Sequence, residues 1–329
     1  CEKLFDLADQ NIDIDDSSEP GIVWPEQNAI QKHIISCVSM SCIDLNRIQK
    51  RKFKIVIDSV NGAGSNALPS LLESLGCEVF ELYCEPDGNF SRGTEPLPEN
   101  LKDLGEKVLE YGADAGFAID PDADRLALVS EIGVPLGEEY TLVVAADGYL
   151  NERDKPEKFV VNLSTSIAIE RLAESKGSSV ERSSVGEINV VNKMNEIGSN
   201  FGGEGNGGVI LSQSHYGRDA FIGSVLILNY LATNNLTMNE AQQKIPKYYM
   251  LKEKIEIDNQ LPSEIISQKI KQLFTELIFD ETDGIKVIDE NFWIHIRQSN
   301  TEPIIRIYIE SKNKQDLSNL FNKVKGIFK

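Results

Sequence analysis

The sequence predicts an α/β fold: two repeated mixed-sheet α/β domains, followed by a C-terminal α+β domain with an antiparallel sheet. Strand-like apolar runs alternate with helical segments in the first part of the chain, which is the pattern of βαβ units. The order of strands and helices in the first unit then returns in a second. Beyond residue 236, strands follow one another across short turns, which indicates antiparallel pairing.

These changes of pattern divide the 329 residues into four parts. We expect an N-terminal tail and linker at 1–26, a first α/β domain at 27–135, a second at 136–248 and the α+β domain at 249–329. A chain of this length is long enough for two or three folded domains.

In the first α/β domain, apolar residues at helical spacing predict one long helix over residues 28–48. A strand, a glycine-rich turn, a helix and a second strand follow at 53–58, 59–65, 67–76 and 77–83. The turn resembles a dinucleotide-binding fingerprint by letter, but it lies too far from the strand, so we interpret it as an ordinary strand-to-helix turn. Another helix is expected at 98–111, with Gly112 as its C-cap.

The second α/β domain repeats this order. The expected elements are helix 140–150, strand 158–163, helix 166–176, strand 178–182, helix 188–197 and helix 220–233. The tail is expected to contain strand 250–257, helix 262–277, a hairpin of 284–288 with 292–297, strand 304–310 and helix 314–328. The longest apolar run, 221–232, has the length of a buried helix and is too short to span a bilayer.

Composition excludes several classes of function. A net charge of −19 and a pI near 4.7 argue against a nucleic-acid partner, which requires a basic surface. No segment is long and apolar enough for a membrane protein. The five cysteines form no C-x-x-C pair and no disulfide framework, so reduced thiols and a cytoplasmic location are expected.

The stretch around Asp120 organises the chain. Two apolar runs enclose residues 120–125, D-P-D-A-D-R, which we call the aspartate loop. A tight turn there would aim Asp120, Asp122 and Asp124 at one point. Their charges repel unless a hard cation lies among them, and carboxylates suit Mg²⁺. With Arg125 beside it, such a cation would face a phosphoryl group.

Other interpretations of the aspartate loop stay open. It could be an Asp-rich surface turn. A phosphatase with an aspartyl nucleophile is another alternative. An EF-hand is disfavoured because Arg125 occupies the position that needs glycine, and strands flank the loop where helices should be.

A second loop, residues 203–208 with the sequence G-E-G-N-G-G, is called here the glycine loop. Its glycines let the backbone approach a ligand closely, while Glu204 and Asn206 offer hydrogen-bonding groups suited to sugar hydroxyls. A strand follows where a nucleotide loop needs a helix. An ordinary glycine-rich hairpin is the alternative.

A third loop, residues 297–306, is called the arginine loop. Arg297 and Arg306 bracket a polar segment, which predicts a phosphate-binding loop. The candidate phosphate-binding residues are Arg297, Ser299, Asn300, Thr301 and Arg306. A polar hairpin loop without a ligand is the alternative.

Taken in this order, the three loops resemble the α-D-phosphohexomutase family of phosphoglucomutases, phosphomannomutases and phosphoglucosamine mutases. The glycine loop and the run V-G-E-I-N at 185–189 are most similar to the archaeal-type phosphoglucosamine mutases. The resemblance implies four domains and interconversion of hexose 1-phosphate and 6-phosphate. It also implies a phosphoserine and a hexose 1,6-bisphosphate as intermediate or activator.

The resemblance also implies roles for residues. Asp120, Asp122 and Asp124 would hold Mg²⁺, and Arg125 would contact the phosphoserine or the sugar phosphate. Glu204, Asn206 and Glu187 would bind the sugar. The arginine loop would hold the distal, non-reacting phosphate of a small-molecule hexose phosphate.

One feature of the family is missing. Its nucleophile lies in a T-A-S-H-N-P-like run of the first domain, and this sequence has no such run. The Ser214-His215 pair lies in a different context, after the glycine loop. We therefore expect residues 1–26 to be the tail of an absent first domain and this chain alone to be inactive.

The sequence leaves some choices open. The hexose could be glucosamine, mannose or glucose, and the oligomeric state is open. A truncated chain that binds Mg²⁺ or sugar phosphate without turnover is a further alternative. The missing first domain could reflect an expression fragment, a gene fragment or a genuine truncation.

Overall fold

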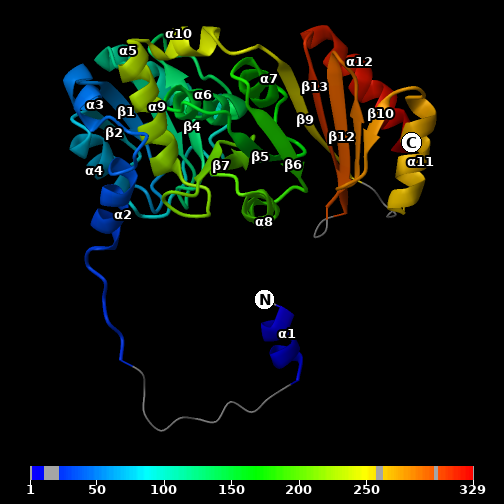
Figure 1. Ribbon diagram of the computed structural model, residues 1–329, viewed down its shortest axis with the longest axis horizontal. Coiled ribbons are helices and arrows are strands. Elements are labelled where there is room, and N and C mark those ends of the chain that lie inside the picture. Colours follow the sequence, from blue (N-terminus) through cyan, green and yellow to red (C-terminus); the bar gives the residue numbers. More distant parts are fainter. Residues whose placement is uncertain (1, 11–21, 257–261, 300–302, 329) are drawn as a thin grey trace.

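The fold is seen in a computed structural model, which describes residues 2–10, 22–256, 262–299 and 303–328 (Figure 1). After an N-terminal helix α1 (Glu2–Asp9), the described chain forms three sheets. The predicted linker at 11–21 and the candidate residues Asn300 and Thr301 lie outside the described residues. No helix in the described part of the chain combines the length and apolarity that crossing a membrane requires.

The first sheet has the order β2-β1-β3-β4. Its strands are β1 (Lys54–Asp58), β2 (Glu78–Leu82), β3 (Ala115–Ile119) and β4 (Leu126–Ser130). β1 runs parallel to β2 and β3, whereas β4 is antiparallel to β3. Helix α4 (Ala67–Ser74), the short helix η1 (Pro98–Asn100) and α5 (Lys102–Tyr111) connect the parallel strands. Gly112 ends α5 with a φ of 56°, the predicted left-handed C-cap.

The second sheet repeats this topology in the order β6-β5-β7-β8. Its strands are β5 (Lys158–Asn162), β6 (Ser179–Ser183), β7 (Phe201–Glu204) and β8 (Gly208–Leu211). The connecting helices are α7 (Ala168–Ser175) and α8 (Glu187–Ile197). Again three strands are parallel, and the last turns back as a hairpin. The expected repetition of a mixed-sheet unit is confirmed.

Two buried helices lie in the core shared by these sheets, α6 (Glu138–Asn151) and α9 (Ala220–Asn234). A Cβ added at Gly148 of α6 would lie 2.9 Å from the Leu226 carbonyl oxygen of α9, so glycine allows their close approach. Asp219 caps α9, because its carboxylate accepts from the backbone N–H of Phe221 at 2.7 Å. The predicted buried helix over the apolar run is confirmed.

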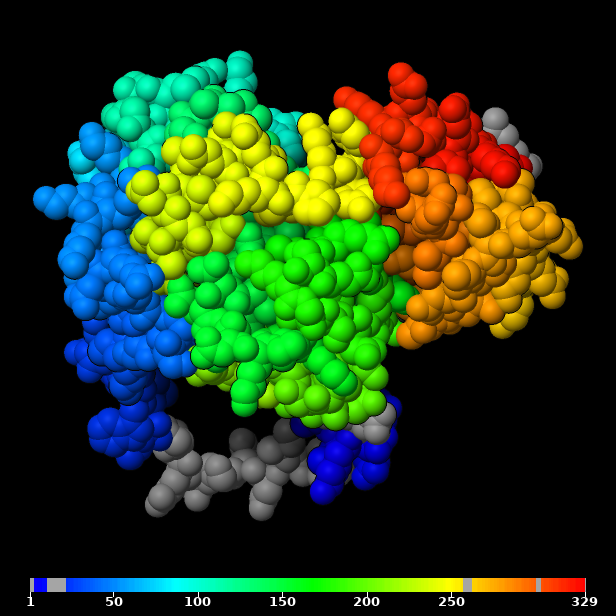
Figure 2. Space-filling view, turned by 45° about the horizontal axis from the view of Figure 1, so that its top comes forward, coloured from blue at the N-terminus to red at the C-terminus, as the bar shows by residue number. Residues whose placement is uncertain are grey.

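The third sheet is antiparallel throughout, in the order β10-β11-β12-β13-β9. Helix α10 (Met238–Gln243) leads into it, and its strands are β9 (Tyr249–Glu256), β10 (Ile278–Asp280), β11 (Ile285–Ile288), β12 (Phe292–Gln298) and β13 (Ile304–Ser311). Helices α11 (Ser263–Leu273) and α12 (Lys314–Lys325) pack on one face, and η2 (Gly326–Phe328) follows. Figure 2 shows this C-terminal part, orange to red, as a separate mass beside the rest.

The long helix predicted over 28–48 is wrong. Two helices, α2 (Ala29–Val38) and α3 (Leu45–Arg51), flank a turn in its place. Asn229 of α9 accepts from the Asp44 N–H at 2.9 Å and donates to the Cys42 carbonyl at 3.1 Å. Asp44 also caps α3 through the Arg47 N–H. These tertiary and capping hydrogen bonds stabilise the turn over a continuous helix.

The helix predicted over 262–277 is also too long. It ends at Leu273, and β10, which was not predicted, follows. Glu276 has a φ of 76°, which continues no helix. β10 is only three residues long and gains its pairing from β11, so a local pattern gives little sign of it.

Buried polar contacts fix the third sheet to the second. The Lys286 ammonium donates to the Leu163 carbonyl at 2.6 Å, and Glu310 accepts from the Ile167 N–H at 2.9 Å. His295 is fully buried between Ser164 Oγ, 2.8 Å from its Nδ1, and the Asp283 carbonyl, 2.6 Å from its Nε2. A neutral imidazole satisfies both groups, with Nδ1 accepting and Nε2 donating.

This contact predicts a pH dependence. Burial lowers the pKa of His295 from its ordinary 6.5 to about 4. The unfolded chain therefore binds a proton between these values that the folded chain does not, so stability falls as pH drops through this window. Urea unfolding should show a loss of about 2–3 kcal/mol between about pH 7 and pH 4.5 from this group. Over the same pH range, the free energy of unfolding of His295→Gln should fall less than that of the parent chain by this amount. Equal losses in the two proteins would contradict a buried, neutral His295.

Candidate functional site

The aspartate loop joins β3 to β4, two strands that are buried along their whole length. Ala123 has a φ of 61°, a left-handed conformation that tightens the turn. Ligand oxygens of Asp120, Asp122 and Asp124 consequently lie within 4.8 Å of one another. The structure therefore brings the three predicted carboxylates together.

Protein groups satisfy part of this negative charge. Asp120 is fully buried, and burial, with Asp124 next, raises its pKa. Its Oδ1 accepts from the N–H groups of Asp124 and Arg125 at 3.1 and 3.0 Å, and Arg125 Nε lies 2.5 Å from Oδ2. Within the part of the chain that the structure describes, Asp124 Oδ1 is buried without a hydrogen bond and lies 3.5 Å from Arg125 Nε. An unsatisfied carboxylate oxygen in a cluster of hard oxygen donors fits a magnesium ion.

The glycine-rich turn after β1 packs against the backbone of the aspartate loop at Pro121. The Ala63 N–H donates to the Pro121 carbonyl at 2.7 Å. A Cβ at Gly62 would lie 2.5 Å from the same oxygen, so this close approach requires glycine. The turn thus helps to fix the position of the aspartate loop through backbone contacts.

Arg92 was not predicted as a site residue. It anchors the segment between β2 and η1 to the edge of the first sheet that carries the aspartate loop. It is buried, with Nε 2.6 Å from Asp58 Oδ2 and Nη2 donating to the Ile119 carbonyl at 2.6 Å. Glu95 of this segment pairs with the guanidinium of Arg125, one contact being Nη2 to Oε1 at 3.1 Å. The predicted catalytic arginine is therefore held between Asp120 and Glu95.

The glycine loop lies in the β7–β8 hairpin, the position in the second sheet that corresponds to the aspartate loop in the first. The glycine loop contacts the first residue of β4, directly after the aspartate loop, because the Leu126 N–H donates to the Gly207 carbonyl at 3.1 Å. A Cβ at Gly207 would lie 2.3 Å from the Leu126 carbonyl oxygen. Glycine at this position allows this contact.

The sugar-site candidates lie close together. Glu204 is buried and accepts from Asn162 Nδ2 at 2.7 Å and from the Gly186 N–H at 3.1 Å. Asn206 Nδ2 lies 3.5 Å from Glu204 Oε2. Glu187, at the start of α8, keeps 38% of its side chain exposed and accepts from the Arg218 N–H through Oε1.

Lys252 of β9 supports the glycine loop from the third sheet. Its ammonium lies 2.8 Å from Glu138 and from Glu139, and 3.4 Å from the Gly205 carbonyl. Burial raises the pKa of Glu139 to about 7, and Lys252 opposes that shift. A Cβ at Gly205 would collide with the Glu139 carboxylate at 1.9 Å, which accounts for this glycine.

Arg218 joins the aspartate and glycine loops. Its guanidinium contacts Asp124 through Nη2 and lies 2.6 Å from Glu204 Oε2 through Nη1. Its backbone N–H donates to Glu187 at 2.7 Å. Burial alone would lower the pKa of Arg218, but Glu204, Asp124 and Glu187 raise it. Arg218 was not predicted as a site residue. The available signal was that two loops carrying carboxylates, at Asp124 and Glu204, require a cation between them.

The arginine loop connects β12 to β13 in the third sheet. Arg297 and Arg306 are directly opposite each other across the two strands. Like charges in this position are unfavourable unless an anion or acid lies near them. Among the described residues, Arg297 Nε is buried and has no hydrogen-bond acceptor; it lies 3.6 Å from Asp283 Oδ1. The Ser299 N–H donates to the Ile304 carbonyl at 3.0 Å and closes the described part of the loop.

Comparison with known proteins agrees with this architecture. Family models described as phosphoglucomutase/phosphomannomutase alpha/beta/alpha domain II, alpha/beta/alpha domain III and C-terminal domain match residues 31–133, 137–249 and 253–326. A phosphoglucomutase/phosphomannomutase family protein from Burkholderia thailandensis has a similar fold, with a TM-score of 0.77 at 24% identity, covering 91% of this chain and 63% of that one.

Relatives in archaea are more similar in sequence. The chain is 37% identical to a phosphoglucomutase/phosphomannomutase of Thermococcus kodakarensis over 83% of its length, and 31% identical to a probable phosphoglucosamine mutase of Methanopyrus kandleri over 95%. It spans 60% and 68% of those relatives. The fold and loops define a chain with the architecture of a phosphohexomutase. It belongs to the phosphoglucomutase/phosphomannomutase family.

The position of Arg218 predicts a large effect on stability. Arg218→Ala would leave Asp124 and Glu204 without their shared guanidinium, and breaking such a buried pair costs about 3 kcal/mol. Arg171→Ala is the matched control, because Arg171 pairs with Glu174 on an exposed helix surface, and such a pair contributes about 0.5 kcal/mol. Chemical unfolding measures both, and equal effects would contradict the bridging role.

Proposed function

We propose that this chain provides the metal, sugar and phosphate sites of a phosphohexomutase that interconverts hexose 1-phosphate and hexose 6-phosphate, with glucosamine phosphate as the substrate. The observation that carries this proposal is the contact between the aspartate and glycine loops, bridged by Arg218. This contact supports the proposal because it joins the three aspartates to the candidate sugar-binding residue Glu204. A phosphomannomutase or phosphoglucomutase is the alternative within the same class.

In this proposal Asp120, Asp122 and Asp124 hold Mg²⁺, which supplies positive charge to a transferring phosphoryl group. Arg125, oriented by Asp120 and Glu95, adds a guanidinium to the same oxygens. The contacts that orient Arg125 are present without a substrate, so this guanidinium would need little reorganisation in the transition state.

Glu204, Asn206 and Glu187 then bind the sugar. The partly exposed Glu187 carboxylate suits the ammonium group at C2 of glucosamine, which glucose and mannose lack. Arg297, Ser299, Asn300, Thr301 and Arg306 hold the distal phosphate. Binding of this distal phosphate would orient the phosphate that reacts at the other end of the sugar.

We also propose that the chain as given does not turn over substrate, because it carries no T-A-S-H-N-P-like run to supply a phosphoserine. We also propose that a hexose 1,6-bisphosphate is the intermediate or activator of the reaction and that the protein acts in the cytoplasm. A second candidate function, sugar-phosphate binding without turnover, follows from the same missing run.

Magnesium titration tests the aspartate loop. We expect calorimetry to show one bound Mg²⁺ per chain. Asp122→Asn should lower the Mg²⁺ affinity at least about tenfold, because the exposed Asp122 carboxylate can turn toward a cation. Asp154→Asn removes an exposed carboxylate elsewhere and should leave the affinity unchanged. A parent-like affinity in Asp122→Asn would argue against this ligand set.

Sugar-phosphate titration tests the arginine loop. With Mg²⁺ present, glucosamine 6-phosphate should bind more tightly than mannose 6-phosphate or glucose 6-phosphate. Arg297→Ala should weaken all three by about 10- to 100-fold, the effect of a lost charged hydrogen bond. Arg47→Ala, an exposed arginine in α3, is the control.

The same preparation should show no mutase turnover unless a segment that carries a phosphoserine run is supplied. Full affinity in Arg297→Ala would refute the phosphate site. Turnover by the chain alone would refute the need for that segment.

A further inference from the structure

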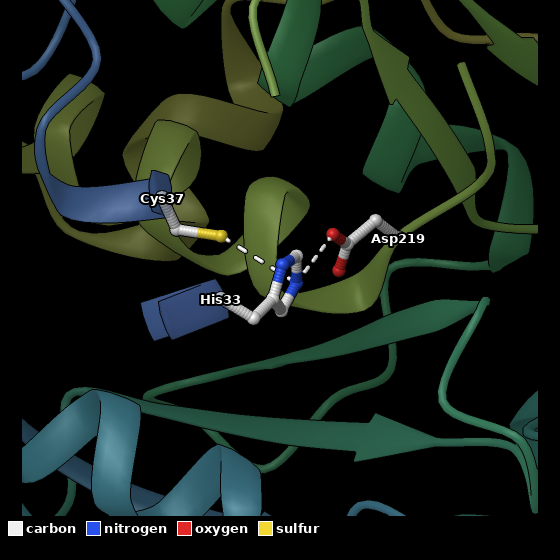
Figure 3. A group of neighbouring side chains, drawn as sticks. All are labelled: His33, Cys37 and Asp219. Atoms are coloured by element: carbon white, nitrogen blue, oxygen red, sulfur yellow. Dashed lines mark hydrogen bonds and ion pairs between the residues drawn. The ribbon is translucent and has the colours of Figure 1, made fainter. Parts of the chain in front are cut away.

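Three metal-ligating side chains, those of His33, Cys37 and Asp219, meet outside the loops described above (Figure 3), and His215 contacts the same aspartate. His33 and Cys37 are four residues apart on α2 and share one face of that helix. Asp219 caps α9, and His215 lies in the turn that precedes it. Two segments far apart in sequence thus direct two imidazoles, a thiol and a carboxylate toward each other.

The donor atoms are close. His33 Nε2 lies 2.8 Å from Asp219 Oδ2 and 3.7 Å from Cys37 Sγ, and His215 Nε2 lies 2.9 Å from the same Asp219 oxygen. In a tetrahedral zinc site with metal–ligand distances of about 2.0–2.3 Å, neighbouring donors are about 3.2–3.7 Å apart. Ligand atoms of His33, Cys37 and Asp219 all lie within 4.8 Å of one another. His215 is held at the same Asp219 oxygen, and its partly exposed side chain would turn toward the thiol to complete the four ligands.

Contacts other than those of the cluster hold its two halves together. Ser36 Oγ on α2 lies 3.4 Å from Ser214 Oγ beside His215. Asn229 ties the turn after α2 to α9 through the two hydrogen bonds given above. The ring of Phe221 packs against His33 at 5.2 Å. The arrangement is therefore preformed by packing as well as by the polar groups themselves.

We propose that His33, Cys37, His215 and Asp219 form a zinc-binding site. Two imidazoles, a thiolate and a carboxylate are ligands that zinc accepts, and the sulfur disfavours Mg²⁺. Four protein ligands make a closed, structural site. Each histidine would bind through Nε2 and carry its proton on Nδ1.

Access and proton balance fit this assignment. The side chains of His33 and His215 are 32% and 44% exposed, so an ion can enter from solvent, whereas Cys37 and Asp219 are buried. Burial raises the pKa of the Cys37 thiol to about 12, which keeps it protonated without a metal. Zinc would replace that proton and release it to solvent as the sulfur–metal bond forms.

The site would also affect the neighbouring loops. Asp219 directly follows Arg218, and the Ala220 N–H donates to the Ala123 carbonyl of the aspartate loop at 3.2 Å. Zinc would therefore link α2 to the segment that positions Arg218. This zinc ion would have a structural role, distinct from the Mg²⁺ that the aspartate loop is proposed to hold.

Cobalt(II) is the test probe, because it takes the place of zinc and reports thiolate ligation through a near-ultraviolet charge-transfer band. We expect the metal-free chain to bind one Co²⁺ with that band. Equimolar Zn²⁺ should displace it, since zinc binds more tightly, and excess Mg²⁺ should not. Cys37→Ser should abolish the band, and His33→Gln and His215→Gln should weaken binding by more than about 100-fold.

Matched controls separate this site from others. Cys42→Ser changes another buried cysteine near α2, and Asp122→Asn changes the aspartate loop; both should keep the band. If Cys37→Ser does not fold, the partly exposed His215→Gln decides. Absence of the band in the parent chain, its persistence in Cys37→Ser, or unchanged affinity in His215→Gln would overturn the proposal and leave the cluster as a polar cap of α9.

Discussion

Charge compensation at the edges of two sheets is the constraint on which the rest of the structure depends. Carboxylates are buried where β1, β3 and β7 end, and an isolated buried carboxylate is costly. Three guanidinium groups offset that cost by pairing with carboxylates from different segments. The pairs are Arg92 with Asp58, Arg125 with Asp120 and Glu95, and Arg218 with Asp124 and Glu204.

The repeated topology explains how one fold provides two kinds of loop. In each α/β unit the last strand returns as a hairpin, and the hairpin turn lies at the carboxyl end of the parallel strand that precedes it, β3 or β7. The first hairpin carries carboxylates and the second carries glycines. The glycines lie where the backbones of the two turns meet, at Gly207 and Leu126, so the second loop adapts to the shape of the first.

Local patterns predicted much of this fold, because strand runs, helix caps and turn residues act within a few positions of one another. The aspartate loop, the cap at Gly112 and the buried helix α9 are examples. Arg218 was beyond that reach, since it is 94 residues from Asp124 and only the folded chain joins them. The break between α2 and α3 was missed for the same reason, because Asn229 of a distant helix stabilises it.

The most direct measurement of the central proposal is anomalous diffraction from crystals of this chain grown with Mn²⁺ and glucosamine 6-phosphate. Mn²⁺ is a hard cation that replaces Mg²⁺ in oxygen sites and can be located by its own signal. The account predicts one strong peak among Asp120, Asp122 and Asp124, with the sugar beside Glu204 and its phosphate at Arg297. A peak away from these carboxylates, or a sugar phosphate bound away from both loops, would contradict it.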